Sequence, residues 1–176
     1  MARLRYVGGS NAPAIEAVFA EIQRMGRPVL NLYRVLANQP PALTAFLGMS
    51  RYVRSASSLD PGLRELVILA TAYELRQDYE IHHHTDAGRK VGLSAEKLAA
   101  VEPGHKLDAL IPEERCAVEF ARQVARTRTC DDATFKRLES FFAPDEIVDL
   151  VVTIAWYHLC AVIIGSLQVD LEANLP

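Results

Sequence analysis

The chain has 176 residues, half of them apolar, and a formal net charge of −3 from 19 Lys and Arg against 22 Asp and Glu. This length suits a single domain over residues 1–176, or a subunit whose core is completed by further copies of the chain. There is no basic excess to neutralise a phosphate backbone, so we expect no nucleic-acid partner.

The cysteines and the first residues indicate a reducing setting. Cys116, Cys130 and Cys160 are widely spaced and form no C-x-x-C pair, which argues against a disulfide framework and a zinc ribbon. The first ten residues lack the apolar stretch of a signal peptide. We therefore expect a cytoplasmic protein.

Proline and glycine fall between periodic apolar segments, and no segment alternates as a strand, so the sequence predicts an all-α fold. The first helices are expected at residues 14–25, 30–37 and 40–55. Asp60 followed by Pro61 predicts an N-cap and first turn for a helix that reaches about residue 75. The sequence leaves open whether this helix bends or stops near residues 76–78.

The second half of the chain is predicted to be helical as well. A helix from Asp78 is expected to end at Gly92, and Ser94 is expected to cap a short helix that closes at residues 102–104. Further helices are predicted at 112–125 and, capped by Asp131, as far as residue 141. The last helix starts after Pro144.

This last helix contains a segment, residues 150–167, with no charged residue unless His158 is protonated. Its length is close to that of a membrane span. Acidic residues flank the segment, and no Lys or Arg lies at either end to set an orientation. We therefore predict a helix buried on nearly every side, covered by another subunit, and no membrane partner.

The strongest candidate for chemistry is the segment 77–84, which reads QDYEIHHH. Glu80 and His84 are four residues apart, so on a helix they lie on one face, where the carboxylate can orient the imidazole or share a proton with it. An interfacial or exposed ion pair is the simpler alternative. The neighbours Asp78, Tyr79, His82 and His83 increase the density of titratable groups.

Other chemistries have weaker support. The acidic and His residues of this segment lack the spacing of the helical zinc signature, and we expect no metal and no cofactor, although carboxylate–His pairs from several subunits could hold an ion. Cys116 and Cys160 fit apolar helical patterns as inert core thiols, and Cys130 lacks positive neighbours. No hydrolase, P-loop or dinucleotide motif is present.

Several segments resemble the carboxymuconolactone decarboxylase family, whose superfamily includes the alkylhydroperoxidase D-like proteins. They are Leu63 to Ala70, Tyr79-Glu80, His84, and the residues from Ala87 to Ser94. The resemblance implies a compact all-α bundle that forms a homotrimer or homohexamer, with a pocket near a subunit interface. In this arrangement residues 1–55 are an N-terminal helical extension, 60–100 carry the motif, and 112–170 are the C-terminal helices.

The peroxidase branch of this superfamily has a motif similar to E-x11-C-x2-C-x3-H. On this chain the pattern places its Glu at Glu65 and its His at His84, but Gln77 and Glu80 occupy the two cysteine positions. A disulfide between those positions cannot form, so the resemblance does not imply the disulfide chemistry of that branch.

The decarboxylase-like branch, which also lacks the thiols, implies a cofactor-free lyase that removes carbon dioxide from a small carboxylated lactone in aromatic catabolism. By this resemblance His84 is the acid, Glu80 its orienting partner and Glu65 a second proton-relay group, while Tyr79, His83 and Arg64 contact the substrate. Two alternatives stay open. One is a noncatalytic oligomer that binds a small ligand, and the other is a peroxide or oxidative-stress protein that works without the usual thiols.

Overall fold

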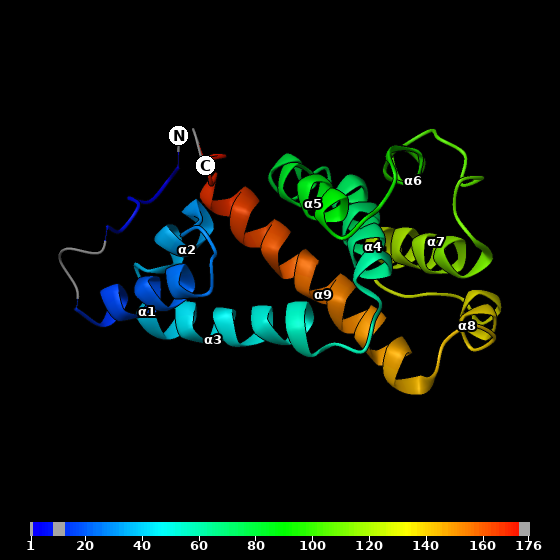
Figure 1. Ribbon diagram of the computed structural model, residues 1–176, viewed down its shortest axis with the longest axis horizontal. Coiled ribbons are helices and arrows are strands. Elements are labelled where there is room, and N and C mark those ends of the chain that lie inside the picture. Colours follow the sequence, from blue (N-terminus) through cyan, green and yellow to red (C-terminus); the bar gives the residue numbers. More distant parts are fainter. Residues whose placement is uncertain (1, 9–12, 173–176) are drawn as a thin grey trace. The chain divides into compact units, whose positions relative to one another are not determined.

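The computed structural model describes residues 2–8 and 13–172, and every regular element within these ranges is helical (Figure 1), which confirms the predicted all-α fold. The α-helices, in chain order, are α1 (Pro13–Arg24), α2 (Asn31–Leu36), α3 (Pro40–Arg51), α4 (Pro61–Glu74), α5 (Asp78–Lys90), α6 (Ala95–Ala100), α7 (Pro112–Thr127), α8 (Asp132–Leu138) and α9 (Pro144–Leu167). A π-helical segment, η2 (Tyr52–Ala56), follows α3.

The chain forms two compact units. One contains the residues up to Arg51 together with those from Ile163 onward, and the other spans Tyr52–Val162. In the first unit, the segment after α9 holds the N-terminal residues, because Asp170 accepts hydrogen bonds from the Ala2 backbone (2.9 Å) and from the Tyr6 hydroxyl (3.0 Å). All the candidate site residues lie in the second unit.

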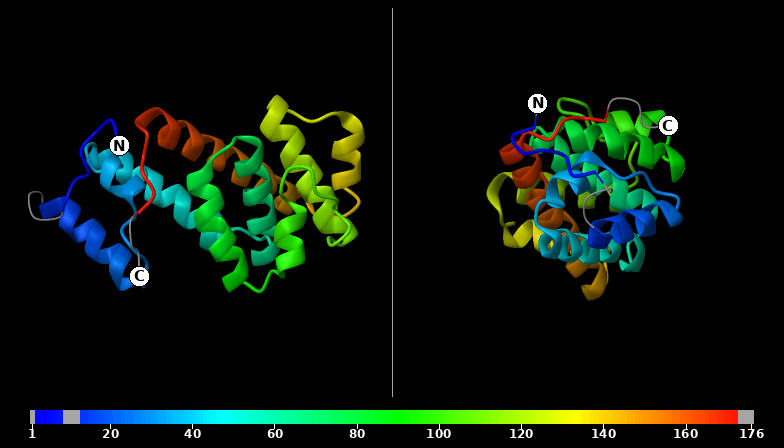
Figure 2. Two further views of the ribbon diagram at one scale, coloured as in Figure 1. Left: turned by 90° about the horizontal axis from the view of Figure 1, so that it is seen from above. Right: turned by 90° about the vertical axis from the view of Figure 1, so that its left-hand side faces the viewer.

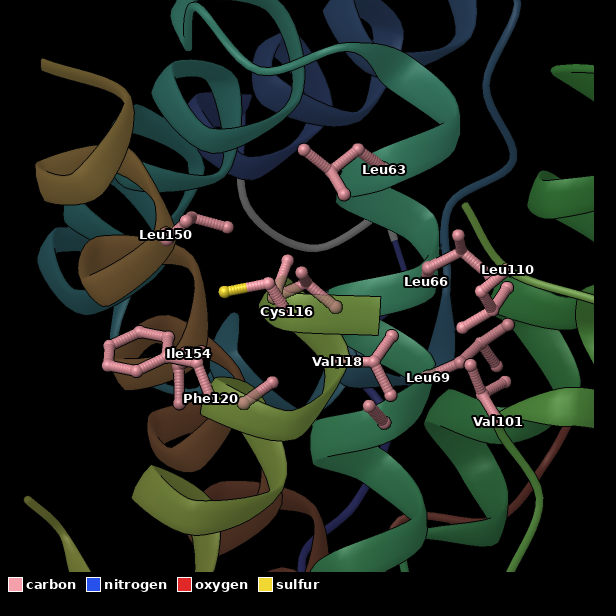
Figure 3. Close-up of a cluster of buried hydrophobic side chains, with 14 of the residues drawn as sticks. Leu63, Leu66, Leu69, Val101, Leu110, Cys116, Val118, Phe120, Leu150 and Ile154 are labelled. Atoms are coloured by element: carbon pink, nitrogen blue, oxygen red, sulfur yellow. The ribbon is translucent and has the colours of Figure 1, made fainter. Parts of the chain in front are cut away.

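Helix α4 is the centre of the second unit, since each residue from Leu63 to Ala72 is buried. It packs against α5 and against α7, and Figure 2 shows α4 and α5 side by side. The apolar core beside α4 is drawn in Figure 3. It brings together side chains of α4, α7 and α9 with residues of the α6–α7 connection, among them Leu66, Leu69, Val101, Leu110, Val118, Phe120, Leu150 and Ile154.

Local signals set the ends of these helices. The Asp60 side chain accepts hydrogen bonds from the backbone N–H groups of Gly62 (2.8 Å) and Leu63 (3.0 Å), as an N-cap does. Helix α4 stops rather than bends, because Arg76 adopts a left-handed conformation (φ 53°) and the Gln77 N–H bonds back to the Ala72 carbonyl (3.0 Å). The chain therefore reverses, and α5 runs antiparallel along α4.

Two predicted boundaries differ from the structure. The third helix ends at Arg51 and continues as η2 instead of reaching residue 55 in α-helical form. Helix α8 ends at Leu138 and not at residue 141, because the Phe141 N–H bonds to the Leu138 carbonyl (2.9 Å) in a tight turn.

Helix α9 is long and apolar enough to cross a membrane, by length and composition alone. One face of it is a core element, with Leu150, Ile154, Tyr157 and Cys160 all buried. The opposite face is exposed in the described part of the chain, and Val162 there keeps 63% of its surface exposed. Coverage of that face by another subunit stays a prediction.

Candidate acid–base site

Three helices converge on the imidazole of His84, which is only 3% exposed. Its Nδ1 atom lies 2.6 Å from a carboxylate oxygen of Glu65 on α4. Its Nε2 atom lies 3.0 Å from the hydroxyl of Tyr157 on α9 and 3.4 Å from a carboxylate oxygen of Glu80 on α5. The ring is therefore held at both nitrogens by oxygen atoms.

The packing of α5 on α4 makes the contact with Glu65 possible. Gly88 lies one turn after His84, and a Cβ at this position would be 2.9 Å from a methyl carbon of Leu98 and 3.9 Å from the Cβ of Glu65. The absence of a side chain at Gly88 therefore makes room for Leu98 of α6 and for Leu93, while the distance to Glu65 is that of an ordinary contact between α5 and α4.

The protonation states of the pair follow from its surroundings. Burial raises the pKa of Glu65, but the hydrogen bond and the charge of His84, followed by the charges of Arg54 and Arg64, lower it below its ordinary value of 4.5. Burial lowers the pKa of His84, but hydrogen bonds with Glu65 and Glu80 raise it above 6.5. Glu65 is thus a carboxylate, and His84 donates the Nδ1 hydrogen to it.

Tyr157 completes the chain of contacts on the Nε2 side. Burial raises the pKa of its phenol well above 10, so the hydroxyl keeps its proton. It can donate to Nε2 when the imidazole is neutral and accept the Nε2 hydrogen when the imidazole is protonated. The sequence analysis did not select Tyr157 as a site residue, although this tyrosine is a polar group within the apolar segment of the last helix.

Cys160 is also part of the site, one turn after Tyr157 on α9. It is buried, as predicted, but its thiol donates a hydrogen bond to Glu80. Burial and then the charge of Glu80 raise its pKa well above 9, so the sulfur stays protonated. Gln77, at the other thiol position of the peroxidase branch, donates to the adjacent Ala161 carbonyl (3.2 Å).

Within the described part of the chain, the residues predicted to contact the substrate do not bond to His84. Arg64 is buried, and its Nε atom lies 3.9 Å from a carboxylate oxygen of Glu65 and has no hydrogen-bond partner among the described residues. The ring of Tyr79 packs on that of His83 with centroids 4.7 Å apart. The side chains of this pair lie about 100° around the axis of α5 from those of Glu80 and His84. Glu65 makes the shortest contact with His84, at 2.6 Å, whereas Glu80, which was predicted to orient the ring, lies 3.4 Å from it.

Arg54 of η2 was not predicted as a site residue. Its positive charge helps to lower the pKa of Glu65 and opposes the rise in pKa that burial causes at Tyr157 and Cys160. No three His, Cys, Asp or Glu side chains within residues 2–8 and 13–172 of one chain are arranged to hold a metal ion. In the described part of the chain, the site is thus an acid–base cluster with a guanidinium group beside it.

Comparison with known proteins finds a family match for the segment that carries Glu65, Glu80 and His84. Residues 40–123 match the carboxymuconolactone decarboxylase family. This match and the AhpD-like structural neighbours support a relation to the carboxymuconolactone decarboxylase and AhpD-like superfamily. The uncharacterized protein YdfG of Bacillus subtilis is 23% identical to this chain over 117 residues, which cover 65% of this chain and 79% of YdfG.

Two solved structures share the AhpD-like fold with the chain. One is an AhpD core protein from Ralstonia eutropha, with a TM-score of 0.85, 20% identity, and coverage of 97% of this chain and 92% of that one. The other is the debrominase Bmp8 in complex with 2,3,4-tribromopyrrole, with a TM-score of 0.83, 17% identity, and coverage of 98% and 95%. At these identities the likeness establishes the AhpD-like fold alone.

Proposed function

We propose that this chain is a cofactor-free lyase of the carboxymuconolactone decarboxylase type, which acts on a small carboxylated lactone or a related enolisable acid in aromatic catabolism. The observation that carries the proposal is the buried contact series from Glu65 through His84 to Tyr157. A carboxylate fixes the imidazole through Nδ1, and a protonated phenol lies on the opposite nitrogen. This arrangement suits proton transfer at pH values near neutral.

Each group has a defined part in such a reaction. Loss of carbon dioxide leaves an electron pair that is delocalised into the lactone carbonyl, and a proton must then be delivered to carbon. The imidazolium of His84 supplies this proton from Nε2, with Tyr157 as the relay on that side. Glu65 holds the ring and stabilises its charge, and Glu80 stabilises the Nε2 hydrogen of the protonated form.

The remaining residues are assigned to substrate contact. Arg64 has a buried Nε hydrogen that no hydrogen-bond acceptor in residues 2–8 and 13–172 pairs with, and an oxygen atom of a bound acid can accept it. The rings of Tyr79 and His83 pack against each other on the same helix as His84. Their part in binding is a proposal that rests on the resemblance and on this placement.

The test is an assay of carbon dioxide release and of deuterium incorporation from D₂O, with carboxylated unsaturated lactones as substrates. His84→Asn keeps a hydrogen-bonding side chain but removes the acid, and we expect kcat to fall by about 10²- to 10⁴-fold. Tyr157→Phe removes only the relay hydroxyl, so we expect a smaller fall in kcat. A folded His84→Asn protein with full activity would contradict the mechanism, and binding without turnover in wild type would favour a noncatalytic ligand-binding protein.

A second candidate is reduction of a peroxide by Cys160, because this thiol contacts Glu80 inside the site. In that reaction the thiol becomes a sulfenic acid and the peroxide is reduced to an alcohol or water. The raised pKa of Cys160 opposes it, since the thiolate is the reactive form. Cys160→Ser distinguishes the candidates: peroxide consumption that disappears in this variant supports the second, whereas retained lyase activity supports the first.

We further propose that the chain works as a homotrimer or homohexamer in the cytoplasm. The three cysteines are free, as a reducing compartment allows. The exposed apolar face of α9 provides a surface that a second copy can cover.

A further inference from the structure

The proposed decarboxylation gives the carboxylate of Glu80 only a supporting part. Loss of carbon dioxide frees an electron pair and needs an acid, His84, but no group has to remove a proton from the substrate. Glu80 is nevertheless buried beside that acid, with 6% of its surface exposed. The site therefore contains a base for which the decarboxylation has no use.

The two carboxylates lie at different distances from the imidazole. Glu65 is 2.6 Å from Nδ1, which is a short hydrogen bond and fixes one hydrogen on that nitrogen. Glu80 is 3.4 Å from Nε2, whereas a tight bond between charged groups measures about 2.7–2.9 Å. Glu65 thus fixes the ring, while the Nε2 hydrogen and the Glu80 oxygen are bound less tightly and can each react with a ligand.

The Nε2 side of the ring also has a hydrogen-bond donor. The Tyr157 hydroxyl lies 3.0 Å from Nε2 and keeps its proton, so it can donate to an oxygen atom that becomes negative during a reaction. His84 and Tyr157 are both buried. A base, an acid and a neutral donor are therefore grouped around one nitrogen atom and shielded from solvent.

We propose that the site also isomerises unsaturated lactones, with Glu80 as the base and His84 as the acid of an allylic proton shift. Glu80 takes a proton from the carbon next to the lactone carbonyl, and the electron pair of that C–H bond is delocalised as a dienolate. The dienolate oxygen accepts a hydrogen bond from Tyr157. The imidazolium then gives its Nε2 proton to the γ carbon, which shifts the double bond.

The contact between Glu80 and His84 completes the cycle. After the shift, Glu80 is protonated and the ring is neutral, and the abstracted proton returns to Nε2 across the 3.4 Å contact. Decarboxylation consumes a proton from solvent in each turnover, whereas this reaction consumes none, which suits buried groups. The choice of a lactone rests on the proposed function, but the isomerisation needs no carboxyl group on the substrate.

The test uses α-angelica lactone, a five-membered lactone without a carboxyl group, whose isomerisation brings its double bond into conjugation with the carbonyl. Ultraviolet absorbance follows the product. We expect wild type to exceed the rate in buffer, Glu80→Gln and His84→Asn to lose about 10²-fold or more in kcat, and Glu80→Asp to keep part of it. Carbon dioxide release from a carboxylated lactone should fall much less in Glu80→Gln, because that reaction needs no base.

A second measurement uses wild type alone, so it does not depend on the folding of a variant. Lactone with deuterium at the carbon next to the carbonyl is isomerised in ordinary water, and the product is examined by NMR. Because Glu80 passes the abstracted isotope to His84, we expect part of the deuterium at the γ carbon. Product without deuterium at that carbon would contradict exchange between the two groups.

Asp86→Asn is the matched control, because Asp86 is an exposed carboxylate on the same helix as Glu80 and pairs with Arg89. It should isomerise the lactone as fast as wild type. The proposal is overturned if wild type does not exceed the rate in buffer, or if folded Glu80→Gln keeps the wild-type rate. Equal falls of both reactions in Glu80→Gln would make Glu80 a structural residue and would also overturn it.

The outcomes distinguish this activity from the lyase. Isomerisation that depends on Glu80, without carbon dioxide release from any lactone, would keep the isomerase and reject the proposed decarboxylation. Carbon dioxide release that depends on His84, without isomerisation of α-angelica lactone, would do the opposite.

Discussion

His84 is surrounded by oxygen atoms of two carboxylates and one phenol, and each comes from a different helix. Burial alone disfavours a charged imidazole. Here the hydrogen bonds and charges of Glu65 and Glu80 outweigh burial, so the pKa of His84 is higher in the folded protein than its ordinary value of 6.5. Protonation of this ring is therefore coupled to folding.

This coupling predicts how stability depends on pH. Above pH 6.5 the folded protein binds more protons than the unfolded chain at His84, so the contribution of the ring is complete below 6.5 and is lost as pH rises through its folded pKa. Glu65, whose pKa is lowered, contributes fully above 4.5 and loses its contribution as pH falls through its folded pKa. The contribution of the pair should therefore be greatest between pH 4.5 and 6.5.

Urea unfolding over a pH series checks this prediction, with His84→Asn as the reference that lacks the titrating ring. The free energy of unfolding of wild type should exceed that of the variant by less and less above pH 6.5, and the difference should fall by no more than about 1.4 kcal/mol per pH unit. A difference that stays constant or grows from pH 6.5 upward would contradict it.

Gly88 on α5 leaves room for the side chains of Leu93 and Leu98, and this close packing predicts the effect of a larger side chain. Gly88→Leu would force its Cβ against the side chains of Leu98, at 2.9 Å, and Leu93, at 3.1 Å. We expect a loss of about 2 kcal/mol in the free energy of unfolding. Separation of α5 from α4 would also lengthen the bond between Glu65 and His84, so lyase activity of the folded protein should fall.

Gly48→Leu provides the control for this change. Gly48 lies on α3, and a Cβ there meets nothing within 4 Å, so leucine should be tolerated and should gain a few tenths of a kcal/mol or more in helix propensity. Denaturant unfolding and circular dichroism of both variants measure the comparison. Equal stabilities of the two variants would show that Gly88 is not needed for the helix contact.

The elements that were predictable from the sequence depend on local signals. Asp60, Ser94 and Asp131 each cap a helix as predicted, because an N-cap bonds to backbone groups two or three residues further on. The segment η2 was not predicted. Its anchor is Asp149, which is 97 residues from Tyr52 in the sequence and 91 from Ser58, so no local pattern contains it.

The same distinction applies to the site. Glu80 and His84 share one helix face, and the i,i+4 spacing places them together without further information. Glu65 was selected only through the family resemblance, since helical periodicity does not show which residue of α4 faces α5. Tyr157 is 73 residues from His84, and its contact depends on how α9 packs in the second unit. Contacts of this kind follow from tertiary packing and were therefore missed.

At the scale of the whole molecule, helix α9 has an exposed apolar face. Val148, Val151, Leu159 and Val162 are exposed, and their spacing along the helix places them in one stripe. Scattered apolar residues on a surface are normal, but a continuous apolar stripe on one helix indicates an interaction surface. A second copy of the chain is the partner that the proposed homo-oligomer requires.

This surface predicts the effect of charge on assembly. In the double variant Val151→Glu and Leu159→Glu, two carboxylates would have to be buried in the proposed interface, so the oligomer should dissociate to smaller species while the chain stays folded. Sedimentation velocity measures the mass, and circular dichroism checks the helical content. Ile111→Glu, an equally exposed apolar residue at the start of α7 and outside the stripe, should leave the mass unchanged. A monomeric wild type, or a double variant of unchanged mass, would show that α9 does not carry the interface.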